Sequence, residues 1–329
     1  MRSDIELTGK PSPEDFAGNS AGLVARRLFH ATRPKFFPAS ILPVLAGTAW
    51  GFKVSGTFHP AIFLLALLAT ICVHAAANVL NDVGDDSGGT DRVNKDLIYP
   101  YTGGSRFIQT GIMAAANMAR LGITLLAVAA IAGVILLLAK GPMILAFGLT
   151  GVALGVLYSL GPMRLSALGI GEAVVAVAFG VLPVTGAAWL QSGTITTELL
   201  MFSLPISAWV AAILLNNEVP DIGPDGATGK RTLPVRLGLD GTANLYLGIH
   251  FSAVAVVIYV TVLGSLPLAA PLLPLALLYL SYNASTAIRR GVQDRDAMTR
   301  AIESTLKIHM LGSLWLCGCV LFAAVNAPA

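Results

Sequence analysis

Long apolar runs with almost no charged residues dominate this chain and are compatible with only one class of fold. Each is about twenty residues long, enough to cross the roughly 30 Å hydrocarbon layer of a bilayer as a helix. We count nine of them, near residues 36–54, 60–80, 112–138, 142–160, 170–190, 198–216, 243–263, 268–288 and 305–326. Because the runs are continuous rather than alternating, they exclude a transmembrane β-barrel. The prediction is an all-α polytopic membrane protein with nine transmembrane helices.

Composition agrees with this fold class. Hydrophobic residues make up 55% of the 329 positions and charged residues only 12%, against roughly 25% charged residues in soluble domains. Cys72, Cys317 and Cys319 lie inside apolar runs, so we interpret them as small apolar side chains rather than as a disulfide framework. The first 35 residues are polar and lack the apolar core of a signal peptide, so none is expected.

The distribution of positive charge orients the predicted helices. Cytoplasmic connections of membrane proteins carry an excess of Lys and Arg. The N-terminus and the connections after the second, fourth, sixth and eighth runs hold the cations, whereas the other connections hold only Lys53 and Lys140. We therefore expect a cytoplasmic N-terminus, an external C-terminus and a functional face toward the cytoplasm, in a protein of the inner (cytoplasmic) membrane.

Two regions are expected along the chain. Residues 1–25 lack periodicity and predict a mobile cytoplasmic tail. Residues 26–329 predict a single nine-helix membrane domain. An amphipathic piece around residues 23–30 is expected to lie at the membrane surface before the first span.

The most unusual polar stretch runs from Asn78 to Asp91, directly after the second apolar run. Asn78, Asp82 and Asp85 stand at i, i+4 and i+7, which places them on one face of a helix. Carboxylates beside lipid are costly unless a positive charge shares their site. A counter-charge is therefore expected here.

A second acidic stretch runs from Asn216 to Asp225, after the sixth apolar run and on the same predicted side. We expect the two stretches to face each other and to hold a cation bound to an anionic substrate. In proteins, Mg²⁺ is usually held by one or two carboxylates together with substrate phosphate oxygens and water. The candidate metal ligands are Asp82, Asp85, Asp91, Asp221 and Asp225.

Basic residues accompany both stretches and suit the phosphate oxygens of such a substrate. Arg92, Lys95 and Arg106 follow the first stretch, and Lys230 and Arg231 follow the second. Some of these cations are expected to be membrane anchors on the cytoplasmic side instead. The nearby segment 103–105, Gly-Gly-Ser, either offers backbone N–H groups to an anion or forms a plain turn.

Acidic stretches of this kind can also serve functions that involve no phosphate. Neither stretch matches an EF-hand calcium-binding loop, because the alternating Asp and Asn ligands and the terminal Glu of that loop are missing. A proton relay or a cation transporter needs acids or broken helices within the spans. The middle of each span lacks acids, which makes transport a remote alternative. Solvated loop carboxylates capped by nearby Lys and Arg are the simplest alternative.

Several motifs resemble one family. The pattern Asn81-Asp82-x-x-Asp85-x-x-x-Gly89-x-Asp91 resembles the first aspartate-rich motif of the UbiA superfamily of intramembrane prenyltransferases, in the form found in the branch that prenylates 1,4-dihydroxy-2-naphthoate. Asp221-x-x-x-Asp225 resembles the second motif, with a flank at residues 229–238. Further similar pieces are Arg33-Pro34, Thr102-Gly-Gly-Ser105 and the segment from Tyr158 through Glu172.

The resemblance implies an activity and a set of site residues. It implies Mg²⁺-dependent transfer of a polyprenyl group from its diphosphate to a small aromatic acceptor, in a nine-helix bundle within membrane lipid and without a nucleic-acid partner. The implied catalytic residues are Asp82, Asp85, Asp221, Asp225 and Tyr158. The implied substrate-binding residues are Arg33, Asn78, Asn81, Lys95, Arg106, Arg164, Asn217, Lys230 and Arg231.

The second motif departs from the family pattern. Members of the menaquinone branch often carry an Arg just before its first Asp, where this chain has Glu218-Val-Pro220. Pro220, Gly223 and Pro224 also disfavour a helix there. Acceptors of sister enzymes, such as 4-hydroxybenzoate, homogentisate, a chlorophyllide or haem, therefore stay open beside dihydroxynaphthoate.

Overall fold

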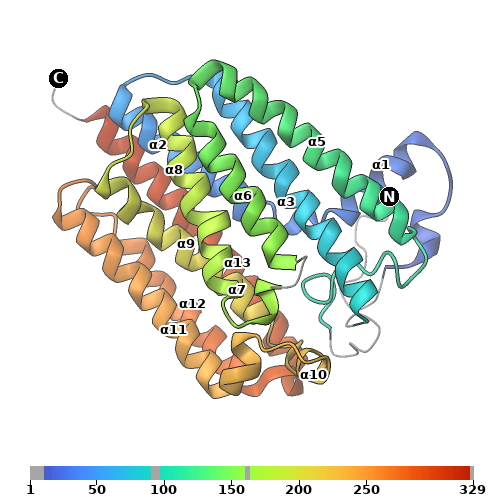
Figure 1. Cartoon of the computed structure of the whole chain (residues 1–329). Coiled ribbons are helices and arrows are strands. Elements are labelled where there is room, and N and C mark those ends of the chain that lie inside the picture. Colours follow the sequence, from blue (N-terminus) through green and yellow to red (C-terminus); the bar gives the residue numbers. More distant parts are fainter. Residues whose placement is uncertain (1–10, 90–96, 160–163, 327–329) are drawn as a thin grey trace.

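Long helices that lie side by side make up the computed structural model (Figure 1). The structure describes residues 11–89, 97–159 and 164–326. Within these ranges the secondary structure is helical and contains no strand, which confirms the predicted all-α fold. Asp91, Arg92 and Lys95 lie outside the described residues, so their roles stay predictions.

Each predicted span falls on a helix of the described chain. These helices are α2 (Pro38–Ser55), α3 (Pro60–Gly88), α5 (Ala115–Lys140), α6 (Met143–Ser159), the continuous α7–η4–α8 (Gly171–Val175, Ala176–Val181 and Leu182–Ser192), α9 (Thr197–Asn217), α11 (Leu233–Val262), α12 (Leu272–Arg290) and α13 (Arg295–Val325). Short helices α1 (Ala21–Ala31) and α10 (Ile222–Ala227) precede the first and follow the sixth.

Length and composition mark a smaller number of these helices as clear membrane spans. Six helical segments of the described chain are long and apolar enough to cross a bilayer, and the last of them, Leu272–Val325, contains both α12 and α13. The apolar α6 is shorter. The exact count of nine spans and their orientation therefore stay predictions.

Several helices extend beyond their apolar runs. The second run ends near residue 80, but α3 continues to Gly88 and carries the first acidic stretch in its last turns. Likewise α13 begins at Arg295, well before the apolar run from 305. Hydropathy locates only the lipid-facing part of a helix, whereas its backbone hydrogen bonds continue into polar surroundings.

The described residues of the N-terminal region form short helical segments that contact the rest of the chain. Residues 13–16 form a short 3₁₀ turn and α1 runs across the expected boundary between residues 25 and 26. Phe16 is only 1% exposed and packs edge-on against Phe107, with ring centroids 4.9 Å apart. The described part of the predicted tail, from residue 11, thus lies against the bundle rather than standing apart from it.

Close helix packing in the bundle relies on small residues. Gly47 and Gly51 of α2 lie directly against the backbone of α8 at Val184 and Ala188, and a Cβ at either glycine would collide with it. Small residues at such contacts let helix backbones approach closely in membranes. The same hydrophobic core continues around Trp209 and joins α2 and α8 to α9, α11 and α13. The helices are therefore held in fixed positions around the site.

Contacts at one end of the bundle agree with the predicted alternation of connections. The Lys53 Nζ at the end of α2 donates to the Ser265 carbonyl after α11, at 2.6 Å. The backbone N–H of His59 donates to Gln191 Oε1 near the end of α8, at 2.8 Å. Charge sorting places all of these connections on the same outer side. The two acidic stretches meet at the other end.

Candidate active site

A cavity of about 280 Å³ opens where the polar ends of α3, α6 and α9 converge. The start of α2, the segment 101–104, the helix α7–η4 and the loop after α9 complete its wall. Both acidic stretches reach this central cavity, as the sequence predicts. The predicted site residues that line it are Arg33, Asn78, Asn81, Asp85, Tyr158, Asn217, Asp221, Asp225 and Lys230.

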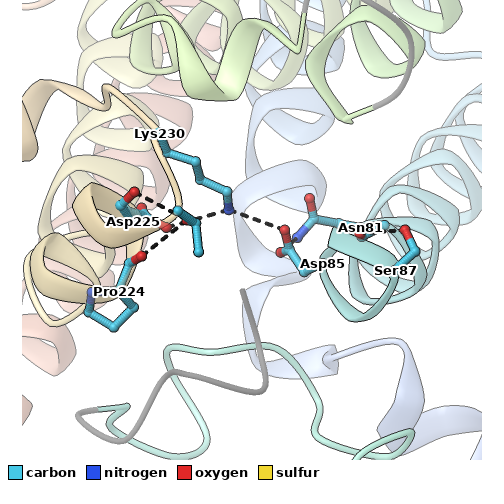
Figure 2. Close-up of polar contacts among 8 residues, drawn as sticks. Asn81, Asp85, Ser87, Pro224, Asp225 and Lys230 are labelled. Carbon is cyan, nitrogen blue, oxygen red and sulfur yellow. Dashed lines mark hydrogen bonds and ion pairs between the residues drawn. The ribbon is translucent and has the colours of Figure 1, made fainter. Parts of the chain in front are cut away.

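Lys230 joins the two acidic stretches. Its Nζ lies 3.1 Å from Oδ1 of Asp85 on α3 and 3.4 Å from Oδ1 of Asp225 on α10 (Figure 2). Burial disfavours the ammonium ion, but the two carboxylates outweigh burial and raise the pKa of Lys230 above its usual value. The side chain therefore stays charged and supplies the counter-charge that the buried carboxylates need.

The first acidic stretch presents one face of α3 to the cavity. Asn81 Nδ2 donates to Oδ2 of Asp85 at 2.9 Å, one turn further along the helix (Figure 2). Asn78 Nδ2 donates to the Thr32 carbonyl at 3.0 Å and so fixes α3 against the end of α1. The predicted helical face is present. The side-chain amide of Asn78 holds α3 in place, and that of Asn81 holds the Asp85 carboxylate in place.

Asp82 takes a different position from Asp85. It is 3% exposed, does not line the cavity, and its Oδ2 accepts the backbone N–H of Ser105 at 2.9 Å. Its Oδ1 is buried without a hydrogen-bond partner in the described chain. The carboxylate thereby anchors the segment Thr102–Gly104, which forms part of the cavity wall.

Arg33 reaches the cavity from an uncommon backbone conformation. Its φ of 57° lies in the left-handed region, its guanidinium stacks on Phe36, and its Nη2 donates to the Tyr101 carbonyl at 2.9 Å. In the described chain the non-glycine residues with positive φ are Arg33, Arg106 and Arg164, all predicted to bind substrate. Such conformations cost energy and concentrate at functional sites.

The second acidic stretch turns at residues 218–221 and ends in the short helix α10, although its prolines disfavour a helix there. Asp221 stands immediately before α10, and the backbone N–H of Asp225 donates to the Asp221 carbonyl at 2.8 Å. Pro224 is the third residue of α10, where a backbone N–H has no partner within the helix in any case. The proline therefore costs no hydrogen bond, and the short helix turns Asp225 toward Lys230.

The wall away from the charges is apolar. It includes Val174 and Phe179 of the helix α7–η4 and Ile213 of α9. Residues Ala176–Val181 form a π-helical turn, a feature that occurs frequently at functional sites. A charged end joined to an apolar chamber suits a ligand with an anionic head and a hydrocarbon tail.

Comparison with known proteins identifies the family to which this chain belongs. The model of the UbiA prenyltransferase family matches residues 40–325. The chain belongs to the UbiA prenyltransferase family. It is therefore a prenyltransferase and an integral membrane protein, as its motifs and its apolar helices predict.

Curated relatives of this UbiA family member include menaquinone-branch enzymes. A 1,4-dihydroxy-2-naphthoate octaprenyltransferase of Mycobacterium tuberculosis is 31% identical over 66% of this chain and 72% of its own. The enzyme of the same description from Escherichia coli is 31% identical over 63% of this chain and 67% of its own. The resemblance to this branch that the first motif indicates is thus confirmed at the level of sequence similarity.

Solved structures share the fold. A UbiA homolog from Archaeoglobus fulgidus, solved with GPP and Mg²⁺, superposes with a TM-score of 0.58 over 89% of this chain and 99% of its own, at 15% identity. At that identity the similarity concerns the fold alone. The helical arrangement predicted for the family is the one this chain adopts.

Three predicted substrate-binding residues do not line the central cavity. Arg106 is buried behind the wall, at 3% exposure. Arg164 is exposed, with its guanidinium beside Gly88 at the C-terminal end of α3, where a cation is favourable. Arg231 is exposed too, and its backbone N–H donates to the Ala167 carbonyl at 2.9 Å. Their roles in binding stay predictions.

The predicted list of site residues omits one main feature of the site, a pair of buried acidic side chains. Glu218, which lines the cavity at the end of α9, is 9% exposed, and its carboxyl group lies close to that of Glu172 on α7, which is also buried. Burial, together with the neighbouring Glu172 and Asp225, raises the pKa of Glu218 well above its usual range. Burial beside a second carboxyl group favours the protonated form of such a side chain. Glu218 lies inside the acidic stretch Asn216–Asp225, and this position in the sequence is the signal that could have identified it as a site residue.

The residues present fit a divalent cation only when both stretches contribute. Among the described residues, no group of three or more His, Cys, Asp or Glu stands ready to hold a metal ion. Asp85 and Asp225 nevertheless converge on a single cation, the Lys230 ammonium, and Asp221 lines the same cavity. This donor set is the kind that Mg²⁺ uses when a phosphate supplies the remaining oxygens. Carboxylates from both stretches, Asp85, Asp221 and Asp225, together with a substrate diphosphate would therefore complete the site.

Proposed function

We propose that this protein transfers a polyprenyl group from polyprenyl diphosphate to 1,4-dihydroxy-2-naphthoate, in a Mg²⁺-dependent reaction of menaquinone biosynthesis. The observation that carries the proposal is the Lys230 ammonium between Asp85 and Asp225, at the charged end of a largely apolar cavity. The Mycobacterium tuberculosis and Escherichia coli relatives, which carry the name of this activity, support the choice of acceptor.

The charged end of the cavity suits the diphosphate. An ammonium group has three N–H donors. Lys230 donates one to Asp85 and forms an ion pair with Asp225 at 3.4 Å, which leaves donor capacity for a phosphate oxygen. Arg33 adds a second cation, and its buried Nε has no hydrogen-bond partner in the described chain. Mg²⁺ held by Asp85, Asp221 and Asp225 would supply further positive charge to the leaving diphosphate.

The reaction needs charge stabilisation and a dry chamber. The allylic C–O bond breaks with its electron pair leaving on the diphosphate, where Lys230 and Arg33 stabilise the added negative charge. The allylic cation remains in the apolar part of the cavity beside Phe179, sheltered from water. An electron-rich ring carbon of the acceptor attacks it and forms the new C–C bond. The group on that carbon then leaves without its bonding electrons, as a proton or, where the carbon carries the carboxylate, with release of carbon dioxide, and the aromatic ring is restored. Tyr158 and Glu218 line the same cavity and would be available to hydrogen-bond the hydroxyl groups of such an acceptor.

The placement in the membrane follows the charge sorting. We infer nine spans in one domain, the N-terminus in the cytoplasm and the cavity mouth facing the cytoplasmic side of the inner membrane. The shared end of the acidic stretches and the opposite end marked by Lys53 and Ser265 support this arrangement.

The test is an acceptor screen on purified protein. Labelled polyprenyl diphosphate and Mg²⁺ are incubated with the protein in detergent and with 1,4-dihydroxy-2-naphthoate, 4-hydroxybenzoate or homogentisate. We expect labelled product with dihydroxynaphthoate in excess of the other two by at least about tenfold in kcat/KM, since matched hydrogen bonds to a substrate discriminate by more than that. Preferential labelling of 4-hydroxybenzoate or homogentisate would reassign the acceptor and keep the transferase chemistry.

A further inference from the structure

One face of α6 runs along the cavity from its charged end into its apolar part. Gly151, Leu154, Gly155 and Tyr158 line the cavity, and their spacing of i, i+3, i+4 and i+7 places them on a single helical face. Tyr158 lies near the acidic groups Glu218 and Asp85. At 1.5 Å per residue, Gly155 lies roughly 4.5 Å and Gly151 roughly 10.5 Å back from Tyr158 along the axis.

The two glycines leave open volume in front of the helix. A Cβ at either position would meet no heavy atom within 4 Å in the described chain. Across the cavity, the side chains that α3 contributes to the wall are also small or medium in size: Thr70, Val73 and Ala77. Figure 1 shows α6 beside α3, and the two helices are in contact. The space between them is thus kept clear at two successive turns of α6.

Helix packing does not account for these glycines. Some helical glycines, such as Gly47 on α2 and Gly122 on α5, lie tightly against neighbouring atoms, whereas Gly148 on α6 and Gly248 on α11 are as open as Gly151 and Gly155. A glycine inside a helix costs about 1 kcal/mol relative to alanine. Gly151 and Gly155 incur that cost without a close contact in return, and unlike Gly148 and Gly248 they line the cavity, so the open volume in front of them is part of it.

The side chains around the open volume indicate what kind of ligand would fill it. Leu154, Val174, Phe179 and Ile213 offer hydrocarbon rather than hydrogen bonds. At the charged end, Arg33 Nε, Asn217 Oδ1 and Glu218 Oε2 are buried without hydrogen-bond partners in the described chain, which points to a polar ligand group there. A ligand that satisfies both ends has an anionic head beside Lys230 and an apolar tail that runs back along α6.

We propose that Gly151 and Gly155 set the length of prenyl chain that the cavity accepts, with the donor tail lying across them in sequence from the reacting carbon outward. This inference rests on the proposed function and adds the residues that determine donor specificity. Gly155 lies beside the isoprene units nearest the diphosphate, and Gly151 lies beside units further along the tail.

The test fills the volume with side chains that do not clash with the protein. Gly151→Leu and Gly155→Leu are compared with the wild type over a series of donors from one to eight isoprene units, as kcat/KM for each donor. Gly148→Leu is the matched control, since Gly148 is on the same helix, is equally open and does not line the cavity. Leucine is a better helix former than glycine, so the variants are expected to fold.

Each variant has a distinct expected profile. The wild type uses the whole series, Gly151→Leu loses the longest donors by at least about tenfold, and Gly155→Leu loses donors at a shorter length. Gly148→Leu keeps the wild-type profile. Turnover of the shortest donor by Gly151→Leu shows that the variant is folded and active.

The outcomes separate the inference from the proposed function. Wild-type length profiles in both cavity variants, or an equal shift in Gly148→Leu, overturn the inference while the transferase activity stands. Loss of all donors alike in a variant whose melting temperature matches the wild type also overturns it. If the wild type transfers no prenyl group to any acceptor, the proposed function fails and the inference fails with it.

Discussion

Lys230 and Asp85 lie 145 residues apart in the chain, and the lysine Nζ stands 3.1 Å from Oδ1 of the aspartate. The same ammonium reaches Asp225, so one side chain joins the end of α3 to the loop after α9 (Figure 2). The Lys230 and Asp85 side chains are 22% and 27% exposed, which leaves the pair open to the cavity and to a ligand.

Replacing Lys230 tests whether this ammonium binds the diphosphate. Lys230→Met keeps an unbranched side chain, one atom shorter, and removes the charge, leaving Asp85 and Asp225 without their counter-ion. We expect kcat/KM for the prenyl diphosphate to fall about 10- to 100-fold, since hydrogen bonds to charged groups contribute roughly 1.5–3 kcal/mol. Lys140→Met, the same change on α5 beyond the site, is the control. Equal kinetics for the two variants would contradict the role of Lys230.

Asp82 is predicted to act through the cavity wall rather than through the substrate. Asp82→Ala leaves the Ser105 N–H buried without its acceptor, which costs about 1–3 kcal/mol of stability. Asp82→Asn keeps an acceptor oxygen and is expected to retain more of the wild-type melting temperature in detergent. Asp85→Asn, by contrast, is expected to reduce turnover with little change in melting temperature. The reverse order of stabilities in the two Asp82 variants would contradict the anchoring contact.

The Glu172–Glu218 pair predicts a pH dependence of stability. Because burial raises the pKa of Glu218 in the folded chain, the folded chain binds a proton more tightly than the unfolded chain. This contribution to stability is fully present below the unfolded pKa and is lost as pH rises through the folded pKa. We expect the melting temperature, measured without added metal from about pH 5 to pH 8, to fall less in Glu218→Gln than in the wild type.

The control for this prediction is an exposed acid at the other end of the bundle. Glu198→Gln at the start of α9 makes the same change in a side chain that is exposed. It is expected to leave the wild-type pH dependence intact. A Glu218→Gln profile that parallels Glu198→Gln would show that the buried pair does not titrate in this range.

The helices and the first acidic stretch were largely predictable because their signals are local. Apolar runs give the position of each helix, and the i, i+4, i+7 spacing gives the face that Asn78 and Asp85 share. The same spacing wrongly groups Asp82 with the cavity-lining side chains, because its partner, the Ser105 N–H, comes from a distant loop. Periodicity defines a face of a helix but not what packs against it.

The basic residues were harder to place, because their positions depend on loop backbone. Arg33, Arg106 and Arg164 share a left-handed φ, yet among them only Arg33 lines the cavity. Nothing in the local sequence distinguishes a cation that reaches a cavity from one that lies behind its wall. The length of the loop after α9 allows Lys230 to reach Asp85, and that contact depends on the tertiary fold.

The most direct measurement of the central claim, that both acidic stretches hold one Mg²⁺–diphosphate donor, is the metal dependence of prenyl transfer by purified protein. Labelled prenyl diphosphate and dihydroxynaphthoate are supplied with EDTA, and then with Mg²⁺ in excess. We predict no turnover in EDTA, full recovery with Mg²⁺, and at least about 100-fold lower turnover in both Asp85→Asn and Asp225→Asn at saturating metal. Turnover that persists in EDTA, or that survives either substitution unchanged, would contradict the claim.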